Sequence, residues 1–303
     1  MTAPSPPTAP VSPKPGWLKV KIPADETYFS VSALLEKRGL HTICRSARCP
    51  NIGECWAAKT ATFLILGDIC TRTCAFCAVA KGRPEAPPAG ESERVAEAAV
   101  LLGLRYVVLT SVTRDDLPDG GASRFAAAAA ALRRRIPGVR IETLVPDFGG
   151  DPDSLALVLD AAPDILNHNL ETVEDLYPDI GRPAGHYRRS LGLLGRAKAR
   201  GFTTKSGLMV GLGETEAALA RTFRDLRGAG CDLLTIGQYL QPTRTHAPVV
   251  RYYPPRDFAA LREAARAEGF AGVVAGPLVR SSYHAHELHA SLGPGRKDPS
   301  CAH

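Results

Sequence analysis

Residues 70–77 read C-T-R-T-C-A-F-C, so that Cys70, Cys74 and Cys77 are separated by three and two residues. Three thiolates that converge from a short, turn-rich loop suit a four-iron four-sulfur cluster, because this cluster needs soft anionic sulfur ligands at close range. Three ligands leave one iron open, and an open position can hold a molecule that takes part in chemistry. We therefore predict a catalytic [4Fe–4S] cluster at these three cysteines.

A second triplet lies upstream, where residues 44–55 read C-R-S-A-R-C-P-N-I-G-E-C and carry Cys44, Cys49 and Cys55. Neither triplet has the paired C-x2-C layout of a zinc ribbon, and no histidine pair follows closely, so zinc is the weaker choice. The remaining alternative is a purely structural metal site. The odd number of ligands in each triplet favours a catalytic metal site over a purely structural one.

The composition is that of a globular protein. The 303 residues carry 37 Lys plus Arg against 31 Asp plus Glu, a net charge of +6, with 45% hydrophobic and 22% charged residues. These values exclude a wholly disordered or fibrous chain. No apolar run reaches the roughly 18 residues of a membrane span, and the Pro-rich start lacks the pattern of a secretory signal. We expect a cytoplasmic protein with reduced cysteines and no association with membranes.

Several residues are expected to have no chemical role. Cys231 precedes an apolar run and is expected to be a buried small hydrophobic residue, whereas Cys301 lies in a Gly/Pro-rich tail. The basic run 133–135 is expected to end a helix, and without an aromatic platform it predicts no nucleic-acid partner. His284 and His286 are expected at the surface.

From residue 63 onward, β-rich runs alternate with helical patterns, which is typical of β/α units. The expected strands are 63–66, 106–111, 140–145, 165–170, 203–210 and 233–240, with a possible last strand at 272–275. The expected helices are 91–102, 124–135, 153–161, 186–200, 214–227 and 255–268, with Ser123 as the cap of the second. The pattern predicts an α/β fold, a partial TIM-like (β/α)6 barrel.

Polar residues recur where these strands are expected to end, which in such a barrel is the face that carries the active site. They are Ser111, Glu142, Asn169, Glu171, Lys205, Ser206 and Gln238. Glu142 alone is better explained by a strand-end hydrogen bond or a solvated loop. The triplet of residues 70–77 follows the first strand directly, so the cluster is expected to face the barrel mouth. The glycine-rich run 207–214 lacks the spacing of a nucleotide-binding loop and is expected to form a tight turn near a ligand.

The triplet of residues 70–77, with an aromatic residue before its last cysteine, resembles the motif of the radical S-adenosylmethionine (SAM) superfamily. Six further stretches are similar to the lipoyl synthase family within it: RSARCPNIGECW, SVTRDDLPDGG, NHNLETV, KSGLMVGLGE, TIGQYLQPT and GPLVRSSYHA. The resemblance covers residues 17–286. It implies a flexible tail (1–16), an N-terminal extension with auxiliary cluster ligands (17–62), a radical SAM partial barrel (63–276) and a C-terminal extension with the RSSY motif (277–303).

The resemblance also implies the site residues. Cys70, Cys74 and Cys77 would hold the cluster whose open iron chelates SAM, and reductive cleavage of SAM would give a 5′-deoxyadenosyl radical. The auxiliary [4Fe–4S] cluster would be held by Cys44, Cys49, Cys55 and, unusually, Ser282. The SAM contacts would be Phe76, near the adenine, and Asn169, Glu171 and Lys205.

The reaction that the resemblance implies is sulfur insertion at carbons six and eight of a protein-bound octanoyl-lysine, with the auxiliary cluster as sulfur donor. An unactivated methylene has no acidic proton, so the cofactor carries the hard step and no Ser/His/Asp triad is expected. The implied partners are octanoylated lipoyl carrier domains, namely those of 2-oxoacid dehydrogenase acyltransferase subunits and the glycine cleavage H protein. An electron donor such as flavodoxin or ferredoxin is also implied.

Two alternatives stay open at this point. Another radical SAM activity, such as methylthiolation, would keep Cys70, Cys74 and Cys77 but would not need the first triplet together with the RSSY motif. A non-enzymatic electron carrier with two clusters would need neither a barrel nor an open iron.

Overall fold

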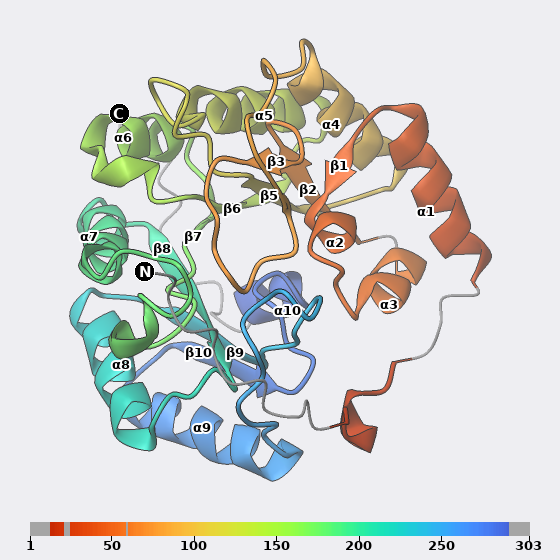
Figure 1. Cartoon of the computed structure of the whole chain (residues 1–303). Helices are drawn as coiled ribbons and strands as arrows, with labels where there is room; N and C mark the ends of the chain where they lie inside the picture. Colours follow the sequence, from red (N-terminus) through yellow and green to blue (C-terminus); the bar gives the residue numbers. More distant parts are fainter. Residues whose placement is uncertain (1–12, 21–24, 59, 291–303) are drawn as a thin grey trace, which may run out of the picture.

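The computed structural model describes residues 13–20, 25–58 and 60–290. Most of the predicted tail (1–16) and the end of the C-terminal extension, with Cys301, lie outside these residues. In the described part, one sheet is ringed by helices (Figure 1).

Within the described residues, the main sheet has eight strands in the order β1-β2-β5-β6-β7-β8-β9-β10, and every neighbouring pair is parallel except β1 with β2. The strands are β1 (His41–Thr42), β2 (Thr62–Ile65), β5 (Tyr106–Ser111), β6 (Arg140–Leu144), β7 (Ile165–Asn167), β8 (Thr203–Val210), β9 (Leu233–Gln238) and β10 (Gly272–Gly276). A separate parallel pair is formed by β3 (Ile69–Cys70) and β4 (Ala80–Lys81). All seven expected strands are therefore confirmed, whereas β1, β3 and β4 were not predicted.

Six helices connect the parallel strands and complete six β/α units, which confirms the predicted partial barrel. They are α4 (Glu91–Leu101), α5 (Ala122–Arg135), α6 (Pro152–Asp160), α7 (Gly185–Ala199), α8 (Glu216–Gly228) and α9 (Pro255–Ala267). The other helices are α1 (Glu26–Lys37), α2 (Ile43–Ser46), α3 (Ile52–Ala57), α10 (Ala285–Ala290) and the 3-10 turns η1 (Gly16–Leu18), η2 (Phe148–Gly150) and η3 (Glu174–Leu176).

The start of α5 differs from the prediction, because Ser123 does not cap it. The N-cap is Gly121, whose φ of 89° lies in the left-handed region that favours glycine. The carboxylate of Asp119 accepts hydrogen bonds from the backbone N–H groups of Gly121 and Ser123, at 2.9 and 2.8 Å. An upstream aspartate thus satisfies donors that the helix leaves free. The basic run 133–135 does lie in the last turn of α5, as expected.

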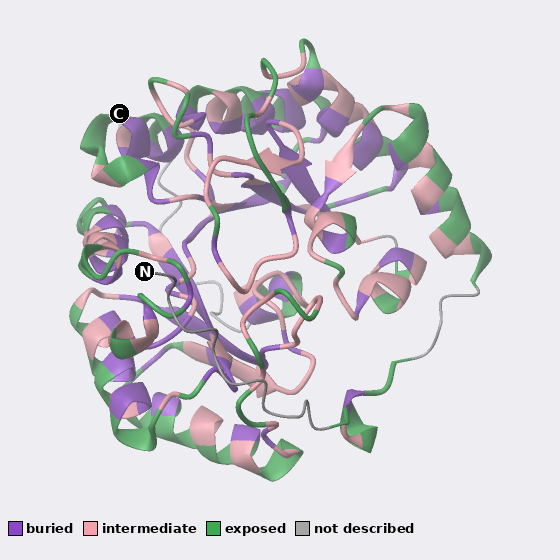
Figure 2. Cartoon of the chain, in the orientation of Figure 1, coloured by how far each residue is buried: buried purple, intermediate pink, exposed green. Residues whose placement is uncertain are grey.

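The core lies between the sheet and the inner faces of the helices, whose outer faces are exposed (Figure 2). All four residues of β2 and all six of β9 are buried. On α8 the buried residues include Leu219, Phe223 and Leu226, at the spacing of one helical face. Burying one such side chain stabilises the fold by about 1.5–3 kcal/mol.

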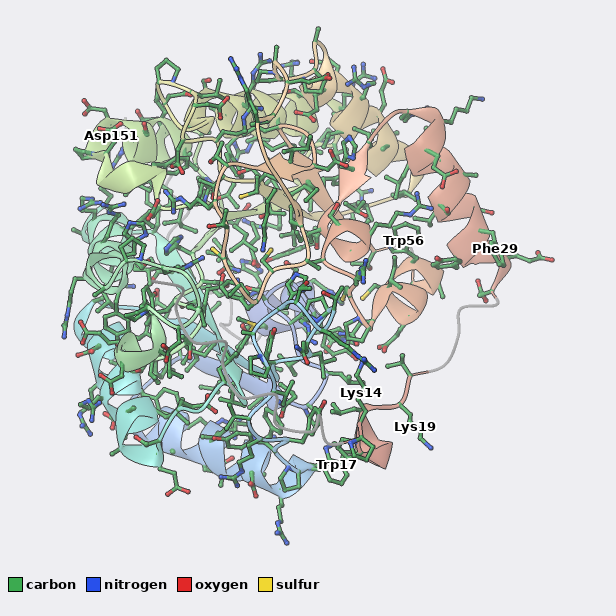
Figure 3. The ribbon with its side chains drawn as sticks, in the orientation of Figure 1. Lys14, Trp17, Lys19, Phe29, Trp56 and Asp151 are labelled. Carbon is green, nitrogen blue, oxygen red and sulfur yellow. The ribbon has the colours of Figure 1, made fainter. Side chains whose placement is uncertain are left out.

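The N-terminal extension packs against the edge of the barrel. Trp56 of α3 is fully buried and stacks on Tyr28 of α1 with ring centroids 5.2 Å apart, whereas Phe29 of α1 points into solvent (Figure 3). The guanidinium of Arg45 lies over the Trp56 ring at 5.2 Å. Because β1 pairs with β2, this packing attaches α2 and α3, which carry Cys44 and Cys55, directly to the sheet, with Cys49 in the turn between them.

Residues 277–290, which we call the C-terminal segment, run from the carboxyl end of β10 to the amino ends of other strands. Leu288 of α10 packs in one cluster with Ile165 and Leu233, the first residues of β7 and β9. The ring of His289 lies 5.8 Å from that of Tyr106, the first residue of β5. The segment thus closes the end of the barrel opposite to its mouth.

Among the described helices, none combines the length and the hydropathy needed to cross a bilayer.

Candidate functional site

A cavity of about 360 Å³ opens at the barrel mouth and brings both cysteine triplets together. Its lining includes Cys44, Cys49, Cys55, Cys70, Cys74 and Cys77. The remaining predicted site residues that line it are Phe76, Asn169, Glu171 and Ser282. One chamber therefore holds the candidate ligands of two clusters and the candidate SAM contacts, with Lys205 as the exception.

Two distant segments hold the loop of residues 70–77 in place. The backbone N–H of Ala75 donates to the carbonyl of Ile180 at 2.9 Å, and its carbonyl accepts from the N–H of Ala247 at 2.9 Å. The imidazole Nε2 of His246 lies 3.0 Å from the carbonyl oxygen of Cys77. The loop backbone is therefore fixed from both sides, which is what a ligand loop needs in order to present its sulfur atoms in a constant arrangement.

The cysteines have the chemistry that an iron–sulfur cluster needs. All six are free thiols. Burial, with Cys74 and Cys70 close by, raises the pKa of Cys77 to about 11. Burial and the neighbouring Cys44 and Cys49 raise the pKa of Cys55 to about 12. Clustered buried thiols of this kind become thiolates when cationic iron neutralises their mutual repulsion, so the donor set fits the group.

In the described part of the chain, no three His, Cys, Asp or Glu side chains converge on a point where one metal ion could bind. The cysteines of a [4Fe–4S] cluster each bind a different iron, so they surround a volume rather than a point.

Glu171 has an unusual backbone conformation. Its φ of 74° is in the left-handed region, which non-glycine residues adopt at a cost of about 1–3 kcal/mol. Bridging hydrogen bonds hold it there: its N–H donates to Gly207 at 3.0 Å and its carbonyl accepts from Met209 at 2.7 Å. Burial raises the pKa of its carboxyl, while Arg182 and a hydrogen bond from Asn169 favour the charged form.

Sequence reasoning missed Arg182, which lines the cavity. Its guanidinium lies 5.6 Å from the ring centroid of Phe76 and 6.0 Å from that of Tyr177. It also forms an ion pair with Glu171 at 3.6 Å. An arginine between an aromatic ring and a carboxylate orients both. No motif surrounds Arg182 in the sequence, so only the fold reveals it.

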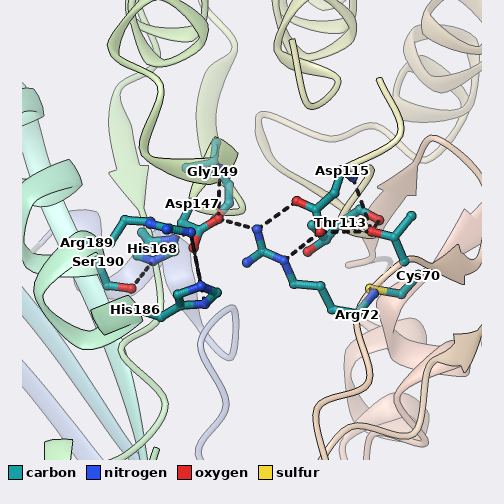
Figure 4. A network of polar contacts seen from close by, with 12 residues as sticks. Cys70, Arg72, Thr113, Asp115, Asp147, Gly149, His168, His186, Arg189 and Ser190 are labelled. Carbon is teal, nitrogen blue, oxygen red and sulfur yellow. Dashed lines mark hydrogen bonds and ion pairs between the residues drawn. The ribbon is translucent and has the colours of Figure 1, made fainter. Parts of the chain in front are cut away.

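Arg72, inside the loop of residues 70–77, was missed as well (Figure 4). Its Nη2 lies 2.8 Å from Oδ1 of Asp115 and 2.5 Å from Oδ1 of Asp147, which follow β5 and β6. Despite burial, the pKa of Asp147 is well below its usual range, because Arg72 donates to it and lies close by. The backbone N–H of Arg72 also donates to Sγ of Cys70 at 3.5 Å. Arg72 thereby ties the ligand loop to the loops that follow two barrel strands.

Three predicted rim residues do not lie at the rim. Lys205 and Ser206 are the third and fourth residues of the eight-residue strand β8, and Glu142 is in the middle of β6. Lys205 and Glu142 are fully buried, with Nζ 3.0 Å from Oε1, and neither is part of the cavity lining. The expected rim positions are wrong because β8 continues past Lys205 and Ser206, and β6 continues past Glu142. Glu142 does accept hydrogen bonds, from Tyr106 and Asn167, but in the buried middle of β6 rather than at a strand end or in a solvated loop.

The other expectations near the site are met in part. Gln238 lines the cavity, but its amide donates to the carbonyls of Val210 and Arg251 at 3.1 and 3.0 Å, so it joins strand ends. Ser111 also lines the cavity, and its hydroxyl is buried without a partner among the described residues. The run 207–214 divides between β8 and a turn, in which the N–H groups of Gly211 and Leu212 donate to Glu214.

Cys231 is fully buried, as expected for a small hydrophobic residue. His284 is at the surface, where it lies 3.2 Å from Glu54 and forms an ion pair with Glu287. His286 is exposed, as expected.

Comparison with known proteins agrees with this geometry. The model of the radical SAM superfamily matches residues 64–226, which is more than half of the chain. A lipoyl synthase of Rubrobacter xylanophilus is 55% identical over 276 residues, which is 90% of this chain and 86% of that protein. A lipoyl synthase of Methylococcus capsulatus is also 55% identical, over 92% of this chain and 88% of its own length.

Solved structures share the fold at much lower identity. The FeFe-hydrogenase maturase HydG of Carboxydothermus hydrogenoformans has a TM-score of 0.53 at 14% identity, over 88% of this chain and 61% of that chain. SuiB of Streptococcus suis, in a structure bound to S-adenosylmethionine, has a TM-score of 0.52 at 13% identity, over 71% of this chain and 50% of that chain. The matched barrel and the level of identity to the sequence relatives lead to one conclusion: the chain belongs to the lipoyl synthase family of radical SAM enzymes.

Proposed function

We propose that this enzyme inserts sulfur at carbons six and eight of a protein-bound octanoyl-lysine and takes the sulfur from an auxiliary cluster. The observation that supports this most directly is the single cavity lined by both cysteine triplets. Two clusters that share one cavity can act on the same substrate molecule. An electron carrier binds no such substrate and needs no shared cavity.

The chain's own residues divide into three groups. Cys70, Cys74 and Cys77 hold the cluster that binds SAM, and Cys44, Cys49, Cys55 and Ser282 hold the auxiliary cluster. Phe76, Asn169 and Glu171 contact SAM. When bound, the first cluster with SAM supplies a radical that abstracts hydrogen, and the auxiliary cluster supplies sulfur.

Lys205 was expected to join the SAM contacts, but its ammonium faces Glu142 in the barrel interior. We propose instead that Lys205 supports the floor beneath the site. Arg182, which lines the cavity beside Phe76 and Glu171, is better placed to contact SAM than Lys205.

The apolar part of the lining suits an octanoyl chain. Val112, Leu144, Val145, Leu208 and Met209 all line the cavity. Each methylene removed from water here contributes about 0.8 kcal/mol of binding free energy. These side chains also exclude water from a reactive radical, which limits side reactions. The protein thus binds and orients the octanoyl chain and shields the radical from water, and the reaction needs no side chain that acts as an acid or a base.

The substrate would be presented by an octanoylated lipoyl carrier domain, either of a 2-oxoacid dehydrogenase acyltransferase or of the glycine cleavage H protein. Reduction would come from a small electron carrier such as flavodoxin or ferredoxin, in the cytoplasm.

The test compares three anaerobically reconstituted proteins: wild type, the Cys70→Ala/Cys74→Ala/Cys77→Ala variant, and Cys231→Ala as a matched control that alters a buried cysteine outside the cavity. Iron and sulfide are counted, and an octanoyl-lysine peptide is incubated with SAM and dithionite before mass spectrometry. We expect about eight irons in wild type and control and about four in the triple variant. Only wild type and control should give a peptide that gains two sulfur atoms.

A single cluster in wild type would contradict the proposal. Cleaved SAM beside an unchanged peptide would leave the radical barrel in place but indicate another substrate, such as that of a methylthiolating enzyme. Absence of SAM cleavage by a fully loaded wild type would favour an electron carrier.

A further inference from the structure

The two serines of the RSSY motif have different surroundings. Both line the cavity, but only Ser281 forms hydrogen bonds with the barrel strands and the residues that follow them. Its hydroxyl donates to Oδ1 of Asn169 at 2.6 Å and accepts from Nδ2 of Asn167 at 3.1 Å. One hydroxyl thus uses both its donor and its acceptor capacity on two asparagines at the end of β7.

These asparagines connect Ser281 to the two ends of the site. Asn169 also lines the cavity together with Glu171, one of the proposed SAM contacts, and favours the charged form of that carboxyl. Asn167 is fully buried and donates through the same Nδ2 to Oε1 of Glu142 at 2.7 Å. Glu142 in turn accepts from Lys205 and Tyr106 at the barrel floor. Through Ser281, the C-terminal segment therefore contacts both a proposed SAM-binding residue, Asn169, and the buried polar network around Glu142.

The position of Asn169 leaves it little freedom. A Cβ added at Gly207 would lie 2.7 Å from its Oδ1, so this strand residue can only be glycine while Asn169 faces Ser281. The hydrogen bond from Ser281 to Oδ1 holds the side chain of Asn169 in one orientation. Loss of the Ser281 hydroxyl would let the amide of Asn169 turn.

The backbone of the C-terminal segment is seated on the same strands. A Cβ at Gly237 of β9 would overlap the carbonyl oxygen of Val279. The Nδ2 of Asn51, which lies between Cys49 and Cys55 in the sequence, donates to the carbonyl of Leu278 at 2.7 Å. A short stretch of chain therefore contacts the barrel and the auxiliary cysteine region together.

We propose that Ser281 is a positioning residue that couples SAM binding to docking of the C-terminal segment, whereas Ser282 is left free for the auxiliary cluster. The inference rests on the proposed function, because it takes Asn169 and Glu171 as SAM contacts. With Ser281 in place, Asn169 is pre-organised for SAM, so the two binding events strengthen one another. Thermodynamic linkage requires the reverse effect to be equal: SAM binding holds the segment to the barrel by the same factor.

The test uses full-length enzyme with both clusters loaded. SAM affinity is measured by equilibrium binding for wild type, Ser281→Ala, Ser281→Thr, Ser282→Ala and the exposed control Ser30→Ala. Ser281→Ala is expected to bind SAM about threefold to tenfold more weakly, the worth of one neutral hydrogen bond. Ser281→Thr keeps the hydroxyl and should restore affinity. Ser282→Ala and Ser30→Ala should bind SAM as wild type does, and Ser282→Ala should still lose sulfur insertion.

A second measurement needs no variant. Hydrogen exchange of the wild-type amides over residues 278–284 should slow when SAM is added. Unchanged SAM affinity in a folded, loaded Ser281→Ala enzyme would overturn the proposal, as would a Ser281→Thr variant as weak as Ser281→Ala. Unchanged exchange in wild type would do the same. If wild type itself neither bound SAM nor formed product, the proposed function would fail instead, so the two failures are distinguishable.

Discussion

The ammonium of Lys205 lies 3.0 Å from Oε1 of Glu142, and both side chains are fully buried in the interior of the barrel. Tyr106 and Asn167 donate to the same carboxylate, each at 2.7 Å. A buried carboxylate with four neighbouring donor contacts is satisfied as an ion, and its partners depend on it.

Removing one partner of this pair should be more harmful than removing both. Lys205→Met leaves the charge of Glu142 buried without its counter-ion, which we expect to lower the free energy of unfolding by about 3–5 kcal/mol. The double variant Lys205→Met/Glu142→Gln should recover part of this loss. Denaturant unfolding of the two single variants and the double variant measures the coupling. Simple additivity of the two losses would contradict the pairing.

Replacing Arg72 should weaken the loop that carries Cys70 and Cys74. Arg72→Gln removes the contacts to Asp115 and Asp147, and we expect a loss of about 1–3 kcal/mol in the free energy of unfolding. Because the pKa of Asp147 is lowered in the folded state, its contribution is present above the unfolded value of about 3.9 and is lost as the pH falls through the lower folded value.

The difference in stability between wild type and Arg72→Gln should therefore shrink below about pH 4. Arg72→Lys is the matched control, since it keeps the charge but cannot bridge two carboxylates in the same plane. Its free energy of unfolding should lie between those of wild type and Arg72→Gln. A difference that does not vary with pH would mean that the ion pairs of Arg72 are not its source.

His168 should make the protein less stable in mild acid. It is fully buried between the Val145 carbonyl and the Ser190 hydroxyl, both at 2.8 Å, and burial lowers its pKa to about 4. Between about pH 6.5 and pH 4, the unfolded imidazole binds a proton that the folded one does not. Stability is therefore lost as the pH falls through this window, by up to about 3 kcal/mol. Thermal midpoints across this range should fall more steeply for wild type than for His168→Gln, and parallel curves would contradict the assignment.

Gly237 should tolerate no side chain. Gly237→Ala would force the Val279 carbonyl away from β9 and displace the C-terminal segment. We expect faster hydrogen exchange over residues 278–284 and loss of sulfur insertion. Gly228→Ala is the control, because nothing lies within 4 Å of a Cβ at that helical position, and it should be neutral or slightly stabilising. If both variants showed similar hydrogen exchange and similar sulfur insertion, the close packing of Val279 against Gly237 would be refuted.

The sequence allowed the fold and the cysteines of the site to be predicted, but not the ion pairs around them. The seven parallel strands were evident because each is a short apolar run between helical patterns. The strands β1, β3 and β4 have two residues each, which is too short to show any periodicity. Lys205 was misplaced because a lysine is usually exposed, whereas here it lies in the polar first half of β8 and is buried against Glu142, a partner that the sequence does not reveal.

Arg72, Arg182 and Ser281 illustrate a different limit. Their partners lie far away in the sequence: Arg72 meets Asp147, and Ser281 meets Asn169. Such contacts depend on which strand ends lie close together in the fold. The pattern of neighbouring residues in the sequence does not contain this information. The left-handed conformation of Glu171 is likewise set by its bridge to β8, since a glutamate carries no local preference for it.

The path of the C-terminal segment has a consequence for how this protein is made. The segment follows in sequence every strand that it contacts, including β5, β7 and β9. During synthesis those strands leave the ribosome before it does, so the sheet can assemble while the barrel is still open at its far end. The end of the barrel opposite to the mouth can therefore close only after the whole sheet has been synthesised.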